Sequence, residues 1–364
     1  MNIFRKMFRV ERKENYKVFH ILGFKIKHKS KYKKMVSRLE HTINQLQQKV
    51  DAQERIISLI DEKKLKILMQ SKVDISAKYA RALSMPHINR DQVESWVENI
   101  YQSGVSGRKG NPELIVSLTS YPARMYDLHL YLYSLLMQDH KPDKLILWLG
   151  EEQFPNRELD VPEKVKRLQK WGLEIKWCPD YKSFKKCIPA FKEYPDAYIV
   201  TADDDTYYPS DWLGKLWETH KSTGAPIVAH RCHRVGMKDG QILPYEMWDQ
   251  HIRTQSISFE NFFTGAGGVL YAPGSLHKDV LNVEKAQELC PHGDDIWLWG
   301  MAVLNHSKIA MPQESMRRLL YINVERAANL NDDGTLYSSN RDGGNDRQLS
   351  QLLAAYPAIL DIIA

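Results

Sequence analysis

The stretch from Glu113 to Gly150 reads ELIVSLTSYPARMYDLHLYLYSLLMQDHKPDKLILWLG, and its hydrophobic pattern changes twice. ELIVSLTS at its start and KLILWLG at its end are short, continuous apolar runs, which are typical of strands buried on both faces. The segment LHLYLYSLLMQ between them has a helical pattern. A strand, a helix and a second strand in this order indicate a parallel sheet covered by helices.

The same alternation continues after Gly150. PEKVKRLQKW (162–171) is predicted to be helical, LEIKWC (173–178) a strand, FKKCIPAFKEY (184–194) a helix and AYIVTAD (197–203) a further strand. We therefore expect residues 111–364 to form one α/β domain with a mostly parallel sheet and flanking helices.

Three consecutive acids, Asp203, Asp204 and Asp205, follow the last of these strands. Ligands of such sheets bind beyond the carboxyl ends of the strands, so the acids lie where a ligand is expected. Neighbouring carboxylates repel one another, and carboxylate oxygens are ligands that Mg²⁺ and Mn²⁺ prefer, so a cation is expected among them. The alternative is a solvated turn whose acids cap a helix beginning near Ser210 or Asp211.

Two further motifs lie later in the chain. NFFTGAGGVLYAP contains Gly265, Gly267 and Gly268, which either permit close approach of the backbone to a ligand or serve a ligand-free turn. CPHGDDIWLW places Asp294 and Asp295 at the start of an apolar helix, where acids also act as ordinary caps.

Five segments, taken in this order, give the chain a resemblance to a known enzyme family. They are LIVSLTSYPAR, SLLMQDHKPDKLILWL, IVTADDDTYYPSDWL, FFTGAGGVLYAPGSL and HGDDIWLW. From Glu113 to Leu352 it resembles the GT-A-fold glycosyltransferases, which have a Rossmann-like sheet. It is similar to family 2-type bacterial enzymes of lipopolysaccharide or capsule assembly, and remotely to exostosin-like transferases. The resemblance implies metal-dependent sugar transfer from a nucleotide-diphosphate donor, a UDP-sugar, with inversion, to a glycan or lipid-linked acceptor.

The resemblance also implies roles for individual residues. It assigns the divalent metal, Mn²⁺ or Mg²⁺, to Asp205 together with Asp203, with Asp203 facing the donor sugar or ribose and Asp204 assisting. It assigns nucleotide-sugar binding to a larger set, in which Tyr121 would stack on the base and Arg124 would meet phosphate: Thr119, Tyr121, Arg124, Asp180, Lys186, Asp203, Asp204, Gly267 and Gly268.

Sugar transfer needs a general base that removes the proton of the acceptor hydroxyl. The resemblance assigns this role to Asp295, with Asp294 as its neighbour, although the Asp-Asp pair stands where many relatives have Glu-Asp. Trp297 and Trp299 follow on the same helix and fit either an acceptor sugar or the core. SSNRDGGNDRQL (338–349) resembles a flexible loop that closes over the donor diphosphate.

The first 35 residues carry 12 Lys or Arg and two acids, so this segment contributes +10 and the remainder of the chain about −4. Because VFHILGFKI (18–26) adds apolar residues to the charge, we expect a basic arm (1–35) on an anionic membrane surface and not on nucleic acid. No apolar run reaches the roughly 20 residues of a membrane-spanning helix. The expected location is cytoplasmic, peripheral on the inner face of the cytoplasmic membrane.

Residues 36–110 are expected to be a helical region and linker. Their apolar residues recur at spacings of three and four, which favours a short coiled coil and a homo-oligomer over a helix packed on its own domain: Leu39, Ile43, Leu46, Val50, Ile57, Ile60 and Ile67. Four scattered cysteines show neither zinc-finger nor disulfide-framework spacing, which favours a reducing compartment.

Two other functions remain compatible with the sequence. A nucleotidyltransferase also places acidic metal ligands on an α/β sheet, and it would release pyrophosphate. A coiled-coil scaffold with an inactive sugar-binding domain would bind donor without turnover.

Overall fold

The structure is a computed structural model that describes residues 8–13, 16–21, 24–28, 41–46, 48, 86–108, 112–316, 319–323 and 343–363. The chain divides into two compact units, Met1–Ser76 and Ala77–Ala364. Of the expected coiled coil, residues 41–46 and 48 are helical, whereas Leu39 and the positions from 49 to 67 lie outside the described residues.

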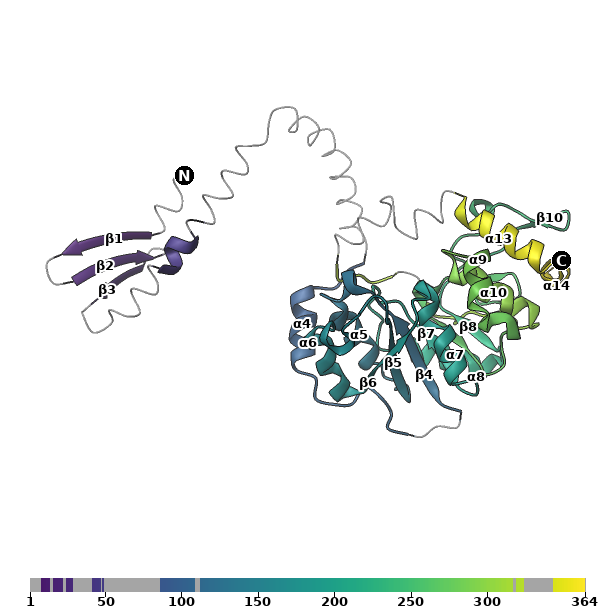
Figure 1. Ribbon diagram of the computed structural model, residues 1–364, viewed down its shortest axis with the longest axis horizontal. Helices are drawn as coiled ribbons and strands as arrows, with labels where there is room; N and C mark the ends of the chain where they lie inside the picture. The colour runs from purple at the N-terminus through teal and green to yellow at the C-terminus, as the bar shows by residue number, and fades with distance from the viewer. Residues whose placement is uncertain are drawn as a thin grey trace, which may run out of the picture. The chain divides into compact units, whose positions relative to one another are not determined.

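The smaller unit contains a three-stranded antiparallel sheet, which the sequence did not lead us to expect. Its strands are β1 (Phe8–Lys13), β2 (Tyr16–Ile21) and β3 (Phe24–His28), in the order β1-β2-β3 (Figure 1). In its register, Ile21 pairs with both Phe8 and Phe24, and Phe19 pairs with both Val10 and Ile26. Apolar residues are therefore register partners across all three strands at these two positions, whereas Val18 stands opposite Glu11 and Lys27.

The larger unit is built on a mixed eight-stranded sheet. Its strands in spatial order are β12 (Ile257–Ser258), β15 (Ile309–Ala310), β8 (Ile227–Ala229), β14 (Val269–Tyr271), β7 (Tyr198–Thr201), β4 (Leu114–Thr119), β5 (Lys144–Gly150) and β6 (Leu173–Cys178). β7, β4, β5 and β6 are parallel, as predicted, and β14 runs antiparallel to both β7 and β8. Figure 1 shows β6, β5, β4, β7 and β8 following one another across the unit.

Helices cover both faces of this sheet. They are α4 (Arg90–Glu98), α5 (Leu128–Leu136), α6 (Glu163–Lys166), α7 (Ile188–Glu193), α8 (Trp212–Thr223), α9 (Val283–Leu289), α10 (Asp294–Leu304), α13 (Gly344–Ala355) and α14 (Ala358–Ile363). Val116 and Leu270 pack with the α5 and α8 core, whereas Tyr271 on the opposite face packs with α10. Successive strand residues thus enter different cores, which explains the continuous apolar runs in the sequence.

Two of the predicted helices are shorter than their sequence pattern. The 162–171 segment is helical in α6 and continues as a 3-10 helix, η4 (Arg167–Trp171). The 184–194 segment is divided into η5 (Lys182–Lys186) and α7, with a break at Cys187 and a proline at position 189. Since proline has no backbone N–H, it suits the first turn of a new helix better than the middle of a continuous one.

The prediction of a loop at 338–349 is wrong for residues 344–349. Residues 344–349 form the first half of α13, where Leu349 and Leu352 are buried, and Leu352 packs with the core around α10. Amphipathic packing outweighs the glycine-rich composition at this helix start. Residues 338–342 lie outside the described part of the chain.

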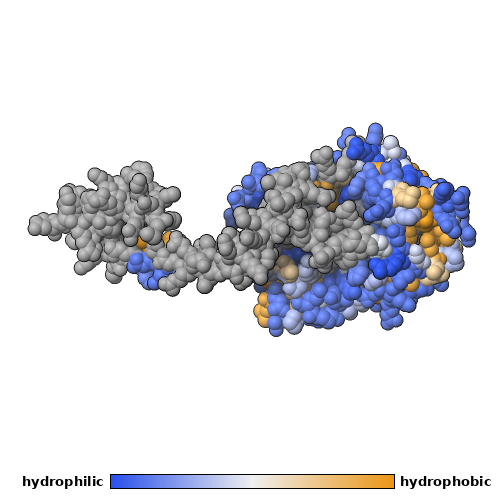
Figure 2. Space-filling view, turned by 90° about the horizontal axis from the view of Figure 1, so that it is seen from above, coloured by the Kyte–Doolittle hydropathy of each residue, from blue (hydrophilic) through white to orange (hydrophobic). Residues whose placement is uncertain are grey.

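The remaining short elements lie around the sheet. They are η2 (Pro122–Arg124), η3 (Arg157–Leu159), β9 (Cys232–Arg234), β10 (Met237–Lys238), β11 (Gln241–Ile242), η6 (Tyr245–Met247), β13 (Asn261–Phe263), η7 (Gly265–Gly267) and η8 (Lys278–Leu281). β9 pairs with β13, and β10 pairs with β11. On the face seen in Figure 2 the described surface of the larger unit is mostly hydrophilic, with hydrophobic residues confined to small patches.

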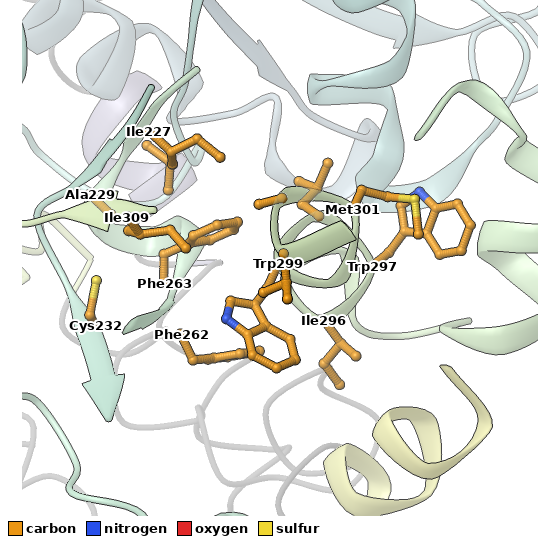
Figure 3. Close-up of a cluster of buried hydrophobic side chains, with 14 of the residues drawn as sticks. Ile227, Ala229, Cys232, Phe262, Phe263, Ile296, Trp297, Trp299, Met301 and Ile309 are labelled. Atoms are coloured by element: carbon orange, nitrogen blue, oxygen red, sulfur yellow. The ribbon is translucent and has the colours of Figure 1, made fainter. Parts of the chain in front are cut away.

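Trp297 and Trp299 belong to the core and not to an acceptor surface. Both are fully buried, and their ring N–H groups donate to the backbone carbonyls of Val280 and Phe259, respectively. Figure 3 shows the two rings leaving α10 in different directions, with Trp299 beside Phe262. α10 is therefore anchored along its length, which fixes Asp294 and Asp295 at its N-terminal end.

Candidate active site

The acid triplet follows β7 at the edge of the sheet where β4 also ends. Asp204 is buried, and it accepts hydrogen bonds from Ser120 Oγ (2.5 Å) and from the Arg124 guanidinium. The same guanidinium lies 2.8 Å from Asp205 Oδ2. Because β4 and β7 are adjacent and parallel, residues 84 positions apart in the chain meet at one point.

Arg124 is the first of two cations that compensate the triplet. Burial lowers the pKa of Arg124, but the carboxylates of Asp204 and Asp205 act in the opposite direction and leave it above its ordinary value. The guanidinium also lies over the ring of Tyr121, 5.3 Å from its centroid. The sequence predicted a positive charge among the acids, and two side chains of the chain itself, Arg124 and Lys186, contribute to it.

Lys186, at the end of η5, is the second cation and joins the two acidic motifs. Its Nζ lies 2.8 Å from Asp203 and 2.9 Å from Asp294. Burial disfavours the ammonium ion, yet Asp203, Asp294 and Asp295 together raise the pKa of Lys186 well above its ordinary value. Lys186 is therefore a charged bridge between β7 and α10.

Asp295 is held by the backbone of the glycine segment. The N–H of Gly265 donates to its Oδ1 at 3.0 Å. Burial raises the pKa of Asp295 to about 7 and Asp294 acts in the same direction, whereas Lys186 and this hydrogen bond lower it. A carboxylate that exchanges its proton near neutral pH is suited to general-base chemistry.

The glycine segment also contacts the acid triplet through aromatic side chains. The N–H of Asp203 donates to the Tyr208 hydroxyl oxygen (2.8 Å), which donates to the carbonyl of Ala266 (3.2 Å). Gly268 has φ +89°, and a side chain there would collide with the Trp212 ring at 2.3 Å. These contacts make the segment part of the site's framework.

Gly265 is needed because Asp295 and Lys186 leave no room for a side chain. A Cβ at this position would lie 2.8 Å from Asp295 Oδ1 and 3.0 Å from Lys186 Nζ. We expect Gly265→Ala to lower the free energy of unfolding by about 1–3 kcal/mol, the usual effect of overpacking, as measured by denaturant titration. Gly214→Ala on α8 is the matched control, because its Cβ meets the nearest atom at 3.5 Å and alanine favours a helix. Equal stability of the Gly265→Ala and wild-type proteins would contradict this packing.

Not all of the predicted nucleotide-binding residues meet at this point. The Thr119 hydroxyl donates to the Trp148 carbonyl (2.8 Å), and Tyr121 keeps an exposed ring beside Arg124. Asp180 follows β6, which β5 separates from β4, and it pairs with Lys185. Of the predicted nucleotide-sugar-binding residues, Arg124 and Lys186 therefore both contact the triplet, whereas Asp180 pairs elsewhere.

Several framework residues were not predicted from the sequence. Tyr208 and Trp212 support the glycine segment, with Trp212 Nε1 donating to the Gly267 carbonyl at 2.7 Å, and Arg231 packs against Gly267. Their sequence context resembles that of ordinary turn and strand-end residues. Only their three-dimensional contacts distinguish these three residues from such ordinary positions.

A divalent ion at the triplet would find only part of a coordination shell in the described residues. Within the described ranges, no group of three or more His, Cys, Asp or Glu side chains is arranged to hold a metal. Asp203 and Asp205 have partly exposed hard oxygen ligands, with 25% and 18% of the side chains accessible. Mg²⁺ commonly binds one or two carboxylates together with substrate phosphates, so this donor set fits an ion that arrives with a diphosphate.

No protein-family model matches the chain, and no curated protein matches it. Similar solved structures include S. aureus TarS 1–349, with 13% identity and a TM-score of 0.39, covering 68% of this chain and 73% of that one. The mannosyltransferase PcManGT from Pyrobaculum calidifontis, in complex with GDP-Man and Mn²⁺, has 12% identity and a TM-score of 0.43 over 81% of this chain and 79% of that one. An inositol-1-phosphate CTP transferase from T. maritima has 12% identity and a TM-score of 0.37, covering 70% and 98%. These similarities assign neither family nor activity.

Proposed function

We propose that the chain is a metal-dependent glycosyltransferase that moves a sugar from a nucleotide-diphosphate donor, a UDP-sugar, to an acceptor hydroxyl with inversion. One observation carries the proposal: Lys186 connects the acid triplet at the end of β7 to an acid pair that includes Asp295, whose pKa is near 7. A site with phosphate-compatible cations and a weakly acidic carboxyl combines the two requirements of glycosyl transfer to a hydroxyl, leaving-group stabilisation and proton removal.

The proposed role of each residue follows from its position in the site. Asp205, with Asp203, would hold Mn²⁺ or Mg²⁺, which when bound neutralises charge on the departing diphosphate. Arg124 would bind phosphate oxygens through its planar fork. Asp295 accepts the proton of the acceptor hydroxyl, and Lys186 holds Asp294 and Asp203 in place beside it.

The reaction is tested by the product it releases. Incubating the full chain with a panel of nucleotide sugars, with and without Mn²⁺, should release nucleoside diphosphate from at least one of them in a metal-dependent manner. Release of pyrophosphate from a nucleoside triphosphate and a sugar phosphate would instead identify a nucleotidyltransferase. Binding of a donor without any turnover, in the presence of a broad acceptor mixture, would favour the non-catalytic scaffold.

Activity should depend on pH through Asp295. Its raised pKa predicts that kcat/KM rises with pH and levels off above about 7, because the carboxylate is the active form.

The raised pKa of Asp295 also lowers the stability of the folded protein as the pH increases from the ordinary pKa of 3.8 towards 7. The reason is that the folded protein binds this proton more tightly than the unfolded chain. Thermal melts of wild type and Asp295→Asn should therefore diverge between about pH 4 and 7, with the wild type losing stability relative to the variant as the pH rises. Parallel melting curves would contradict the shifted pKa.

We further propose that residues 1–35 hold the enzyme on anionic lipid, where a lipid-linked or surface glycan acceptor resides. The apolar pairing across β1, β2 and β3 and the excess of basic residues support this proposal. In the described parts of the chain, no helix has the length and apolar character needed to span a bilayer. Deleting residues 1–35 should abolish cosedimentation with anionic vesicles, with neutral vesicles as the control. Undiminished binding of the truncated protein would refute the proposal.

A further inference from the structure

Arg231 occupies the opposite side of the acid triplet from Arg124. The sheet order β8-β14-β7-β4 places β4, which precedes Arg124, next to β7, whereas Arg231 follows β8 two strands away in the other direction. With about 4.8 Å between neighbouring strands, the two arginines approach the site from different ends. None of the sequence motifs described above contains Arg231.

The stem of Arg231 lies on the glycine segment. A Cβ on Gly267 would lie 2.8 Å from the Arg231 Cγ, so the glycine makes room for this side chain. The backbone carbonyl of Arg231 accepts from the Thr264 N–H at 2.9 Å. The position of the arginine is therefore fixed by the same segment that holds Asp295 through Gly265.

In the part of the chain that the structure describes, the guanidinium of Arg231 has no close counter-ion. Among the described residues no carboxylate oxygen lies within 4.0 Å of it, and its buried Nε has no hydrogen-bond partner. Burial lowers the pKa of Arg231, while Tyr321, Tyr245 and the more distant acids Asp295 and Asp203 act against that effect. Arg231 is half-buried with its Nε enclosed, and a charge that is partly withdrawn from water without a paired anion is unfavourable unless a ligand supplies the missing charge.

A neutral histidine pair orients this guanidinium. Arg231 Nη2 donates to His251 Nδ1 at 3.0 Å, and the His251 backbone N–H donates to His233 Nδ1 at 2.9 Å. Burial lowers the pKa of His233 to about 3, with a further contribution from His251, and burial and Arg231 lower the pKa of His251. His251 also has φ +55°, an uncommon backbone conformation for a residue other than glycine. The arginine is thus held by a hydrogen-bond acceptor that leaves its charge uncompensated.

We propose that Arg231 is a binding residue for a phosphate-type oxyanion that a substrate brings to the β8 side of the site. This inference rests on the proposed function and adds a second anion-binding position to it. The oxyanion has two possible sources, the diphosphate of the donor or a phosphate group on the acceptor. Both present the geometry that a guanidinium binds through two parallel hydrogen bonds.

Calorimetric titration of the full chain tests the proposal in two arms. The first titrates UDP with Mg²⁺, and the second titrates inorganic phosphate into protein already saturated with UDP and Mg²⁺. Arg231→Gln should weaken binding at least about tenfold in one arm, as expected for loss of a charge-assisted pair. Loss in the first arm identifies the donor diphosphate as the source, and loss confined to the second identifies a separate oxyanion on the acceptor.

Matched variants keep the outcomes distinguishable. Arg234→Gln removes a nearby arginine that pairs with Glu260 (3.1 Å), and it should change neither arm. Arg231→Lys keeps a charge but not the planar fork, so it should also weaken binding. If Arg231→Gln shows no cooperative thermal melt, Arg231→Lys replaces it in the test. Unchanged binding in both arms for a folded Arg231 variant would overturn the proposal. If the wild type bound no UDP the proposed function would fail, whereas phosphate titrated into nucleotide-free protein would still test Arg231.

Discussion

Replacing Asp295 with asparagine is expected to reduce sugar transfer about 10²- to 10⁴-fold while leaving donor binding intact. Asparagine keeps an oxygen that accepts the Gly265 N–H, so the local geometry is preserved, but it cannot take up a proton. The loss should appear in kcat and not in the dissociation constant for the nucleotide sugar. Transfer rates and donor titrations on the same preparation measure the two effects separately.

Asp294→Asn is the matched control for this prediction. Asp294 pairs with Lys186 at 2.9 Å, so its substitution should weaken the bridge between α10 and the acid triplet and lower stability more than transfer. If Asp294→Asn abolished transfer and Asp295→Asn did not, the base would have to be reassigned to Asp294. If both variants transferred sugar at the wild-type rate, the acid pair would have no catalytic role.

Replacing Asp205 with asparagine is expected to lower metal-dependent donor turnover by about 10²-fold or more. The substitution removes a charged oxygen ligand and one of the two carboxylates that contact Arg124. Turnover measured over a range of Mn²⁺ concentrations should reach half its maximum at a higher Mn²⁺ concentration than in the wild type. High Mn²⁺ should partly restore turnover. Full activity at limiting Mn²⁺ in this variant would remove the metal role from Asp205.

Asp204→Asn distinguishes the metal role from a structural one. Asp204 is the most deeply buried of the three acids and accepts from Ser120 and Arg124. Its substitution should lower thermal stability without changing the concentration of Mn²⁺ that gives half-maximal activity. A shift in that concentration as large as the one for Asp205→Asn would make Asp204 a metal ligand.

The sheet could be predicted because its strands are buried on both faces and read as uninterrupted apolar runs. β4, β5, β6 and β7 match the predicted segments closely, and the acid triplet follows β7 at the edge where ligands are expected. The helix that begins at Asp294 was also predicted, since nine consecutive apolar or small residues follow the acid pair. In these segments, local pattern and tertiary packing favour the same structure.

The connections within the site could not be predicted, because they depend on which side chains distant segments bring together. Lys186 has a sequence context typical of a solvated helix start, yet it is buried between acids from β7 and α10. Gly344 begins a helix despite its loop-like neighbours because α13 packs on the core. Strands β1 to β3 also went unpredicted, since basic residues interrupt their apolar positions.

The most direct test of the central claim is calorimetry of the full chain with UDP in the presence and absence of Mn²⁺. We expect binding of UDP that strengthens with Mn²⁺ in the wild type, and the metal-dependent part should disappear in Asp205→Asn. No heat of association for UDP or any other nucleoside diphosphate, with Mn²⁺ present, would contradict a diphosphate site at the end of β7.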